Sequence, residues 1–146
     1  MKVYTSEPMH TAEHILNQTM IRLFGCKRSF GAHIERRKSK CDYWLPQAPT
    51  VAEVSFLEER VNEVIEAGLP VTERYVSLAE ANALADLSKL PEGVGENIRL
   101  IEIGDYDVCA CSGPHVENTA EIGRFTVLSH DYKDGCWRVR WRVETE

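Results

Sequence analysis

The chain has 146 residues, of which 43% are hydrophobic and 27% charged, and its formal net charge is −6. These proportions are ordinary for one globular unit with a hydrophobic core, so we expect a single domain over residues 1–146. The sequence contains no run of about 18 apolar residues and no signal-peptide core. This excludes a membrane-spanning helix and predicts a cytoplasmic protein without membrane partners.

The cysteine count and the charge distribution narrow the class of protein further. Five cysteines, an odd number without a secretory signal, argue against a disulfide framework and leave a thiolate available to a metal. The negative net charge argues weakly against nucleic-acid binding, although one short segment is rich in basic residues: Lys27, Arg28, Arg36, Arg37, Lys38 and Lys40. This segment is either the solvated surface of a hairpin or a patch that docks phosphates.

The first predicted element is a helix from about Met9 to Phe24, which Gly25 ends. Its apolar stripe at helical spacing consists of Ala12, Ile15, Leu16, Thr19, Met20 and Leu23. Residues 29–45 come next as two alternating apolar segments around a polar tract at 35–40. That pattern is typical of a β-hairpin with a charged tip.

The middle of the chain contains two helix-capping signatures. Thr50–Glu53 predicts the beginning of a helix that ends at Gly68, and residues 71–76 predict a short strand after it. Ser77–Glu80 is the second signature, and it predicts a helix that continues to about Leu87.

Strands and turns dominate the C-terminal third of the chain. A loop is predicted at 91–95 and a strand at 98–103, whose apolar alternation changes phase after Leu100. This change indicates a bulge or a strand buried on both faces. A short strand at 106–110 is expected to lead into the turn Cys111–His115.

The last two strands are predicted at 123–128 and 136–143, joined by a hairpin turn at Asp134–Gly135. The final strand alternates arginine with tryptophan and valine, which indicates a buried face and a basic outer face. A row of arginines that contacts RNA is the alternative. The irregular order of helices, strands and hairpins favours the α+β class, with an antiparallel or mixed sheet and helices packed on one face.

Two short motifs carry the chemistry. His10 and His14 lie four residues apart on the first helix, so their imidazoles share one face. Cys111 and His115 form a C-x3-H pair in a turn that contains Gly113. Together they make a nitrogen and sulfur set of the kind that zinc prefers. The site would be structural if closed, or catalytic if one position stays open for a water.

Two other interpretations of these histidines remain open. They can be ordinary hydrogen-bonded residues at the edge of the core. Residues 10–14 also match H-x-x-E-H, the inverted zinc-protease motif in which Glu13 would act as the base. The short chain and the second Cys/His pair make the protease interpretation the less favoured one.

With both motifs identified, the chain resembles the editing domain shared by alanyl- and threonyl-tRNA synthetases, and the free-standing AlaX-type proteins related to it. The resemblance rests on residues 10–16 and 111–123, with weaker similarity at 31–34, 42–43 and 58–62. It implies a synthetase editing-domain-like fold. It also implies a zinc-dependent hydrolase that cleaves mischarged aminoacyl-tRNA in trans, with serine on tRNA(Ala) or tRNA(Thr) as the expected substrate.

The resemblance also implies roles for individual residues. The expected zinc ligands are His10, His14, Cys111 and His115. A metal-bound water is the expected attacking group, with no catalytic side chain assigned. The expected substrate-binding residues are Thr11, His33 and Arg36. The alternatives are a metallohydrolase of other small esters and a non-catalytic, zinc-stabilised RNA-binding module.

Overall fold

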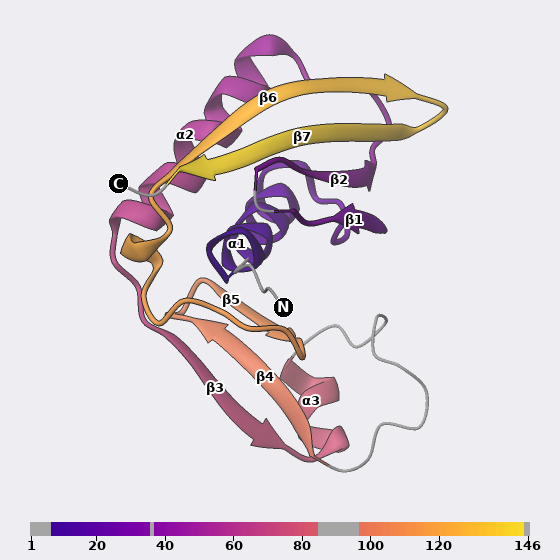
Figure 1. Ribbon diagram of the computed structural model, residues 1–146. Coiled ribbons are helices and arrows are strands. Elements are labelled where there is room, and N and C mark those ends of the chain that lie inside the picture. Colours follow the sequence, from indigo (N-terminus) through magenta and orange to yellow (C-terminus); the bar gives the residue numbers. More distant parts are fainter. Residues whose placement is uncertain (1–6, 36, 85–96, 145–146) are drawn as a thin grey trace.

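The computed structural model describes residues 7–35, 37–84 and 97–144, which form two antiparallel sheets and three α-helices (Figure 1). The predicted α+β class is confirmed. All strand pairs are antiparallel. The larger sheet contains, in spatial order, β1 (Gly31–His33), β2 (Ser39–Trp44), β7 (Cys136–Glu144) and β6 (Arg124–Lys133). No helix within the described ranges is long and apolar enough to cross a membrane.

Helix α1 (Glu7–Phe24) lies between the two sheets in Figure 1 and contacts both β7 and β5. Its predicted apolar stripe is buried except for Leu23, which is partly buried, and Ile15 and Leu16 are fully inaccessible. Asn17 fixes the β1–β2 hairpin to this helix, because its Oδ1 accepts hydrogen bonds from the Ser29 backbone N–H at 3.0 Å and the Tyr43 hydroxyl at 2.7 Å. The helix is therefore the frame on which both sheets are positioned.

Helix α2 (Val51–Glu66) begins as predicted at a capping box. The Thr50 hydroxyl accepts from the Glu53 N–H at 3.1 Å, and the Glu53 carboxylate accepts from the Thr50 N–H at 2.8 Å. This reciprocal pair satisfies two backbone donors that a bare helix start leaves free. Asn62 then ties the helix to β6 through both the N–H and the carbonyl of Phe125, each at 2.9 Å.

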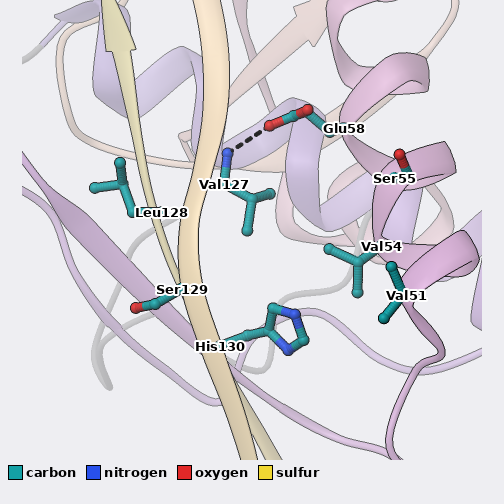
Figure 2. A pocket seen from close by; sticks show the side chains of 8 residues that line it. All are labelled: Val51, Val54, Ser55, Glu58, Val127, Leu128, Ser129 and His130. Carbon is teal, nitrogen blue, oxygen red and sulfur yellow. Dashed lines mark hydrogen bonds between the residues drawn. The ribbon is translucent and has the colours of Figure 1, made fainter.

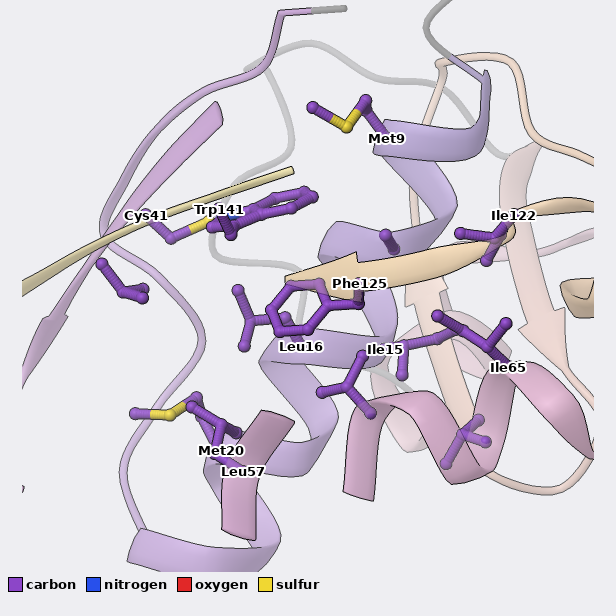
Figure 3. Packing of buried hydrophobic residues seen from close by; sticks show 14 of the residues in the cluster. Met9, Ile15, Leu16, Met20, Cys41, Leu57, Ile65, Ile122, Phe125 and Trp141 are labelled. Atoms are coloured by element: carbon purple, nitrogen blue, oxygen red, sulfur yellow. The ribbon is translucent and has the colours of Figure 1, made fainter. Parts of the chain in front are cut away.

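Both long helices pack on the same face of the larger sheet. The common core contains Leu16 from α1, Leu57 from α2, and Phe125 and Trp141 from the sheet (Figure 3). The predicted alternation of β7 is confirmed, because Trp137, Val139 and Trp141 are fully buried while the arginines between them remain partly exposed. Burial of the large aromatic side chains makes this cluster the main apolar contribution to stability.

Strand β6 is longer than predicted and contains an irregularity. The register against β7 shifts between Val127 and Ser129, and Leu128 is 41% exposed. Figure 2 shows Glu58 of α2 at this point, where its carboxylate accepts the Val127 N–H at 2.7 Å. The bulge leaves Leu128 out of the hydrogen-bonded pairing between β6 and β7. Glu58 supplies an acceptor for the Val127 N–H beside it.

The smaller sheet contains β3 (Val71–Val76), β4 (Ile98–Ile103) and β5 (Asp107–Ala110) in that order. Pairing along β4 is continuous, and its buried residues lie on both faces, so the phase change after Leu100 reflects two-sided burial rather than a bulge. Helix α3 (Leu78–Leu84) begins at the second predicted capping box. The predicted continuation to Leu87 and the loop at 91–95 lie outside the described residues.

Two segments that connect the sheets run side by side. The Val71 N–H donates to the Glu117 carbonyl at 2.9 Å, and the Thr119 N–H donates to the Leu69 carbonyl at 2.9 Å. The short helix η1 (Thr119–Glu121) begins at this pairing. The pairing fixes the chain directly after the Cys111–His115 turn. As a result, the turn is held at both ends: by β5 before it and by the paired segment after it.

Candidate metal centre

The two predicted motifs meet beside the N-terminal half of α1. The metal-binding atoms of His10, Cys111 and His115 all lie within 4.8 Å of one another. The ring of His14 is close to the same group, with its centroid 4.5 Å from that of His115. Residues separated by about a hundred positions in the sequence are therefore brought together, and three of them already form a compact donor set.

Arg99 of β4 holds the turn that carries Cys111. Its guanidinium donates to the backbone carbonyls of Cys111 at 3.0 Å and Gly113 at 2.8 Å. Glu73 of the neighbouring strand β3 pairs with the same guanidinium at 2.9 Å. The turn is thus fixed through its main chain, which leaves the Cys111 sulfur free to face the histidines.

The absence of a side chain at Gly113 allows the Cys111–His115 turn to lie against the ring of His10. A Cβ atom at that position would lie 2.5 Å from Nδ1 and Cε1 of His10, closer than real contacts allow. The Gly113 N–H also points to the Cys111 sulfur, at 3.4 Å. Gly113 is therefore needed for the two motifs to touch, which is a stronger reason for glycine here than turn formation alone.

Thr11 determines which nitrogen of His115 carries the hydrogen. The Thr11 hydroxyl donates to the Glu7 carbonyl at 3.0 Å, as expected for a threonine within a helix. Its single hydrogen is then used, so the contact of 3.0 Å with His115 Nδ1 makes that nitrogen the donor. The other nitrogen, Nε2, is buried without a hydrogen-bond partner in the described part of the chain. It keeps a lone pair for a metal.

A buried carboxylate stands behind His14. The Asp107 Oδ2 atom lies 3.7 Å from His14 Nδ1, and neither atom has a hydrogen-bond partner among residues 7–35, 37–84 and 97–144. Arg28 and Gln18 hold the other carboxylate oxygen of Asp107, the latter at 2.8 Å. A carboxylate behind a histidine is the arrangement that orients metal-binding imidazoles.

The protonation states of these groups suit a metal. Burial, the largest cause, lowers the pKa of His14 well below its ordinary value and that of His115 to about 4. Both rings are then neutral at pH 7, as metal binding requires. Burial raises the pKa of the Cys109 thiol to about 12, so that sulfur stays protonated. The unpartnered Nε2 of His115 and the mixed nitrogen and sulfur donors therefore fit a zinc ion, and the His–Cys–His group could bind a metal.

An open pocket of about 500 Å³ adjoins His115. It is lined by Glu7, Pro8, His115, Val116, Glu117 and Glu121. A second pocket, of about 440 Å³, lies between α2 and β6 and shares no lining residue with the first (Figure 2). Of these two pockets, the first alone has a potential metal ligand of this cluster, His115, among its lining residues.

The three expected substrate-binding residues have different positions. Thr11 is fully buried against His115. His33 lies on the exposed hairpin, where its Nε2 contacts the Glu35 carboxylate at 2.7 Å. Arg36 lies outside the described residues. The basic segment is also less uniform than its sequence indicates, because Arg28 turns inward to pair with Asp107.

Two residues of the site, Arg99 and Asp107, were not predicted from the sequence. Arg99 alternates with buried neighbours on β4, as any outward-facing strand residue does. Asp107 is an acidic residue just before the Cys-rich turn, and its near-complete burial is the only feature that marks it as unusual. Burial of a charged residue depends on the assembled fold, so the sequence contained no direct signal for either residue.

Comparisons with known proteins agree with the motifs. A family model described as the threonyl and alanyl tRNA synthetase second additional domain matches residues 98–140. An alanine–tRNA ligase from Treponema denticola is 34% identical over 137 residues, which is 92% of this chain and 23% of that ligase. The ligase from Pelotomaculum thermopropionicum is 32% identical over 82% of this chain and 14% of its own length. The alanine–tRNA ligase from Bacillus subtilis is 33% identical over 82% of this chain and 14% of its own length. The chain therefore spans less than a quarter of these relatives.

Proposed function

Because this chain is related to the editing region of alanyl- and threonyl-tRNA synthetases, we propose that it hydrolyses the ester bond of mischarged aminoacyl-tRNA. The observation that supports this proposal most is the meeting of His10, Cys111 and His115 within 4.8 Å. The proposed ligand set adds His14, whose ring contacts His115. The reaction is proposed to take place in the cytoplasm, on tRNA in trans, with serine as the amino acid released.

The proposed cofactor is zinc. When bound, zinc supplies a Lewis acid that polarises a carbonyl oxygen and makes water more acidic. His10, Cys111 and His115 would hold it, with His14 as a looser fourth ligand that would leave a position open for water, and two further residues keep histidine rings in the correct tautomer. Thr11 does this for His115 through a contact of 3.0 Å, and Asp107 is placed to do it for His14. An ester is already reactive, so no nucleophilic side chain is required.

The pocket beside His115 is proposed to receive the aminoacyl group. Its volume of about 500 Å³ and open side allow the 3′ end of a tRNA to enter with the amino acid attached. Thr11 remains a proposed substrate-binding residue, and because it is fully buried behind His115 it would act on the substrate through that ring. His33 and Arg36 remain proposed substrate-binding residues, as the resemblance implies.

Deacylation of a panel of charged tRNAs tests this function. We expect the protein to release serine from Ser-tRNA(Ala) or Ser-tRNA(Thr), to leave Ala-tRNA(Ala) intact, to lose activity with a chelator and to regain it with zinc. A simple serine ester is the control. Hydrolysis of the simple ester without any preference for tRNA would replace the proposal with a general esterase. Tight tRNA binding without release of any amino acid would replace it with a binding module.

A thermal melt of His10→Ala separates the catalytic role of the metal from a structural one. The proposal expects a folded variant that binds zinc weakly and does not hydrolyse the ester. If the variant is already unfolded at low temperature, and the wild-type protein unfolds when a chelator removes its metal, the site is a structural zinc site.

A further inference from the structure

One face of the larger sheet is left uncovered by both long helices. The inner face of β7 is fully buried at Trp137, Val139 and Trp141, in the same core as α1 and α2. Residues that alternate with these therefore project to the opposite face. The strand register places thirteen residues on this opposite face: Lys40, Asp42 and Trp44 of β2; Cys136, Arg138, Arg140, Arg142 and Glu144 of β7; and Arg124, Thr126, Ser129, Asp131 and Lys133 of β6. We call this set, together with Phe30, the outer sheet face.

The outer sheet face is basic on an acidic protein. Six of its residues are cationic and three are acidic, whereas the whole chain has a net charge of −6. The cationic residues are Lys40, Arg124, Lys133, Arg138, Arg140 and Arg142. Such an excess of one sign attracts a polyanion from a distance.

The ion pairs within the outer sheet face leave its arginines accessible to another anion. Arg138 pairs with Asp42 at 2.8 Å and Arg140 with Asp131 at 3.0 Å. The side chains of these arginines are 40% and 30% exposed, so part of each guanidinium stays open to solvent, although the side chain of Asp42 is only 8% exposed. A phosphate can therefore share these arginines with the carboxylates. Among the described residues, Arg124 has no ion pair at all.

Two aromatic rings are stacked at one end of this face. Phe30 and Trp44 lie with ring centroids 4.1 Å apart and planes 8° apart, and they are 44% and 60% exposed. Trp44 belongs to β2, directly opposite Cys136 of β7, so the pair adjoins the arginine row. Contiguous exposed apolar side chains, unlike single ones, mark interaction sites. Nucleic-acid bases stack on such rings with little regard to sequence.

We infer that the outer sheet face binds the RNA of the substrate, with phosphates on the arginine row and an unpaired base on the Phe30–Trp44 pair. The inference rests on the proposed function, because tRNA is the only RNA that function requires. An acidic protein could also pair with these arginines, and the comparison with polyglutamate below separates that partner from RNA. The combination of cations and exposed aromatic rings therefore favours RNA.

The fluorescence of Trp44 gives a direct test. The chain has three tryptophans, and Trp137 and Trp141 are fully buried, so Trp44 provides the solvent-exposed part of the emission. We expect uncharged tRNA to quench this part, with an affinity that falls steeply as salt rises. Trp44→Phe should remove the quenching while keeping affinity, measured by fluorescence anisotropy of labelled tRNA, within about twofold.

Two variants separate the two kinds of contact. Arg140→Gln should weaken tRNA binding and lower the slope of log affinity against log salt by about one. Replacing both rings, by Phe30→Ala with Trp44→Ala, should weaken binding about tenfold while leaving that slope unchanged. Arg60→Gln is the matched control, because Arg60 is an exposed arginine paired with Glu63 on α2, away from this face.

Uncharged tRNA contains no ester, so binding is measured independently of hydrolysis. A protein that binds uncharged tRNA through this face but hydrolyses no mischarged tRNA would contradict the proposed function and support the surface. A protein that deacylates mischarged tRNA while Arg140→Gln and the ring variant bind like Arg60→Gln would support the function and overturn the surface. Quenching by polyglutamate as strong as that by tRNA would also overturn it, because an acidic protein would then be the fitting partner.

Discussion

Single hydrogen bonds decide what the histidines of the candidate metal centre can do. The Thr11 hydroxyl gives its hydrogen to a backbone carbonyl and accepts one from His115, so the free nitrogen of that ring is the one that is buried beside the other ligands. The donor set was predictable from the H-x3-H and C-x3-H spacing. This tautomer control was not, because it depends on a contact between residues 104 positions apart.

Replacing Thr11 tests the role of its hydroxyl in selecting the tautomer. Thr11→Val keeps the shape of the side chain but removes the hydroxyl, so we expect zinc affinity to fall about 10- to 100-fold, as measured with a chelating indicator. Thr11→Ser keeps the hydroxyl and should bind zinc like the wild type. Equal affinities for the valine and serine variants would contradict a role for the hydroxyl.

Cys109 and Cys111 are expected to differ in their effect on the zinc content of the protein. Cys111→Ala should lower the zinc content of the purified protein, because its sulfur lies within 4.8 Å of the donor atoms of His10 and His115. Cys109→Ala should leave the zinc content unchanged, since its sulfur does not belong to the group of donor atoms formed by His10, Cys111 and His115. Metal analysis of both variants checks this, and the reverse order would overturn the ligand assignment.

At the scale of elements, the site depends on how closely a turn approaches a helix. The turn after β5 is held by Arg99 and carries a glycine against the ring of His10. The sequence predicted the turn and the helix separately, from Gly113–Pro114 and from the apolar stripe of α1. It could not predict the distance between them, which depends on the second sheet packing against the first helix.

Gly113→Ala tests this close approach. The added methyl group would lie 2.5 Å from the His10 ring, so the turn and the ring must move apart. We expect zinc affinity to fall at least about tenfold, by isothermal titration calorimetry, while the melting temperature of the metal-free protein changes little. Gly31→Ala is the matched control, because its added methyl group would make only an ordinary contact of 3.5 Å. Unchanged affinity in Gly113→Ala would contradict the geometry.

Strands β2 and β7 are joined by the Asp42–Arg138 pair, which predicts a dependence of stability on pH. Hydrogen bonds from Arg138 hold the pKa of Asp42 below its ordinary value. The pair therefore stabilises the fold above the ordinary pKa of about 3.9, and this contribution is lost as the pH falls through the lower pKa of the folded state.

Urea unfolding at about pH 6 and about pH 3 measures this contribution. The free energy of unfolding should fall further in the wild type than in Asp42→Asn between these two conditions, because the variant has no carboxylate to protonate there. Equal losses would show that the pair contributes nothing to the acid response.

At the scale of the whole molecule, the sequence predicted the class of fold and the order of its elements. The capping box at Thr50, the alternation of β7 and the hairpin turn at Asp134–Gly135 are all local patterns, and the structure confirms each of them. The division of the strands into two sheets with α1 between them was not predictable. It depends on long-range pairing, such as that between Leu69 and Thr119, which no local pattern encodes.

The central claim is that four side chains from the two ends of the chain bind one zinc ion. X-ray absorption at the zinc edge tests it most directly. We predict one zinc per chain, with one sulfur at about 2.3 Å and nitrogen ligands at about 2.0 Å, and loss of the sulfur signal in Cys111→Ala. A first shell made only of oxygen, or one with two or more sulfurs, would contradict it.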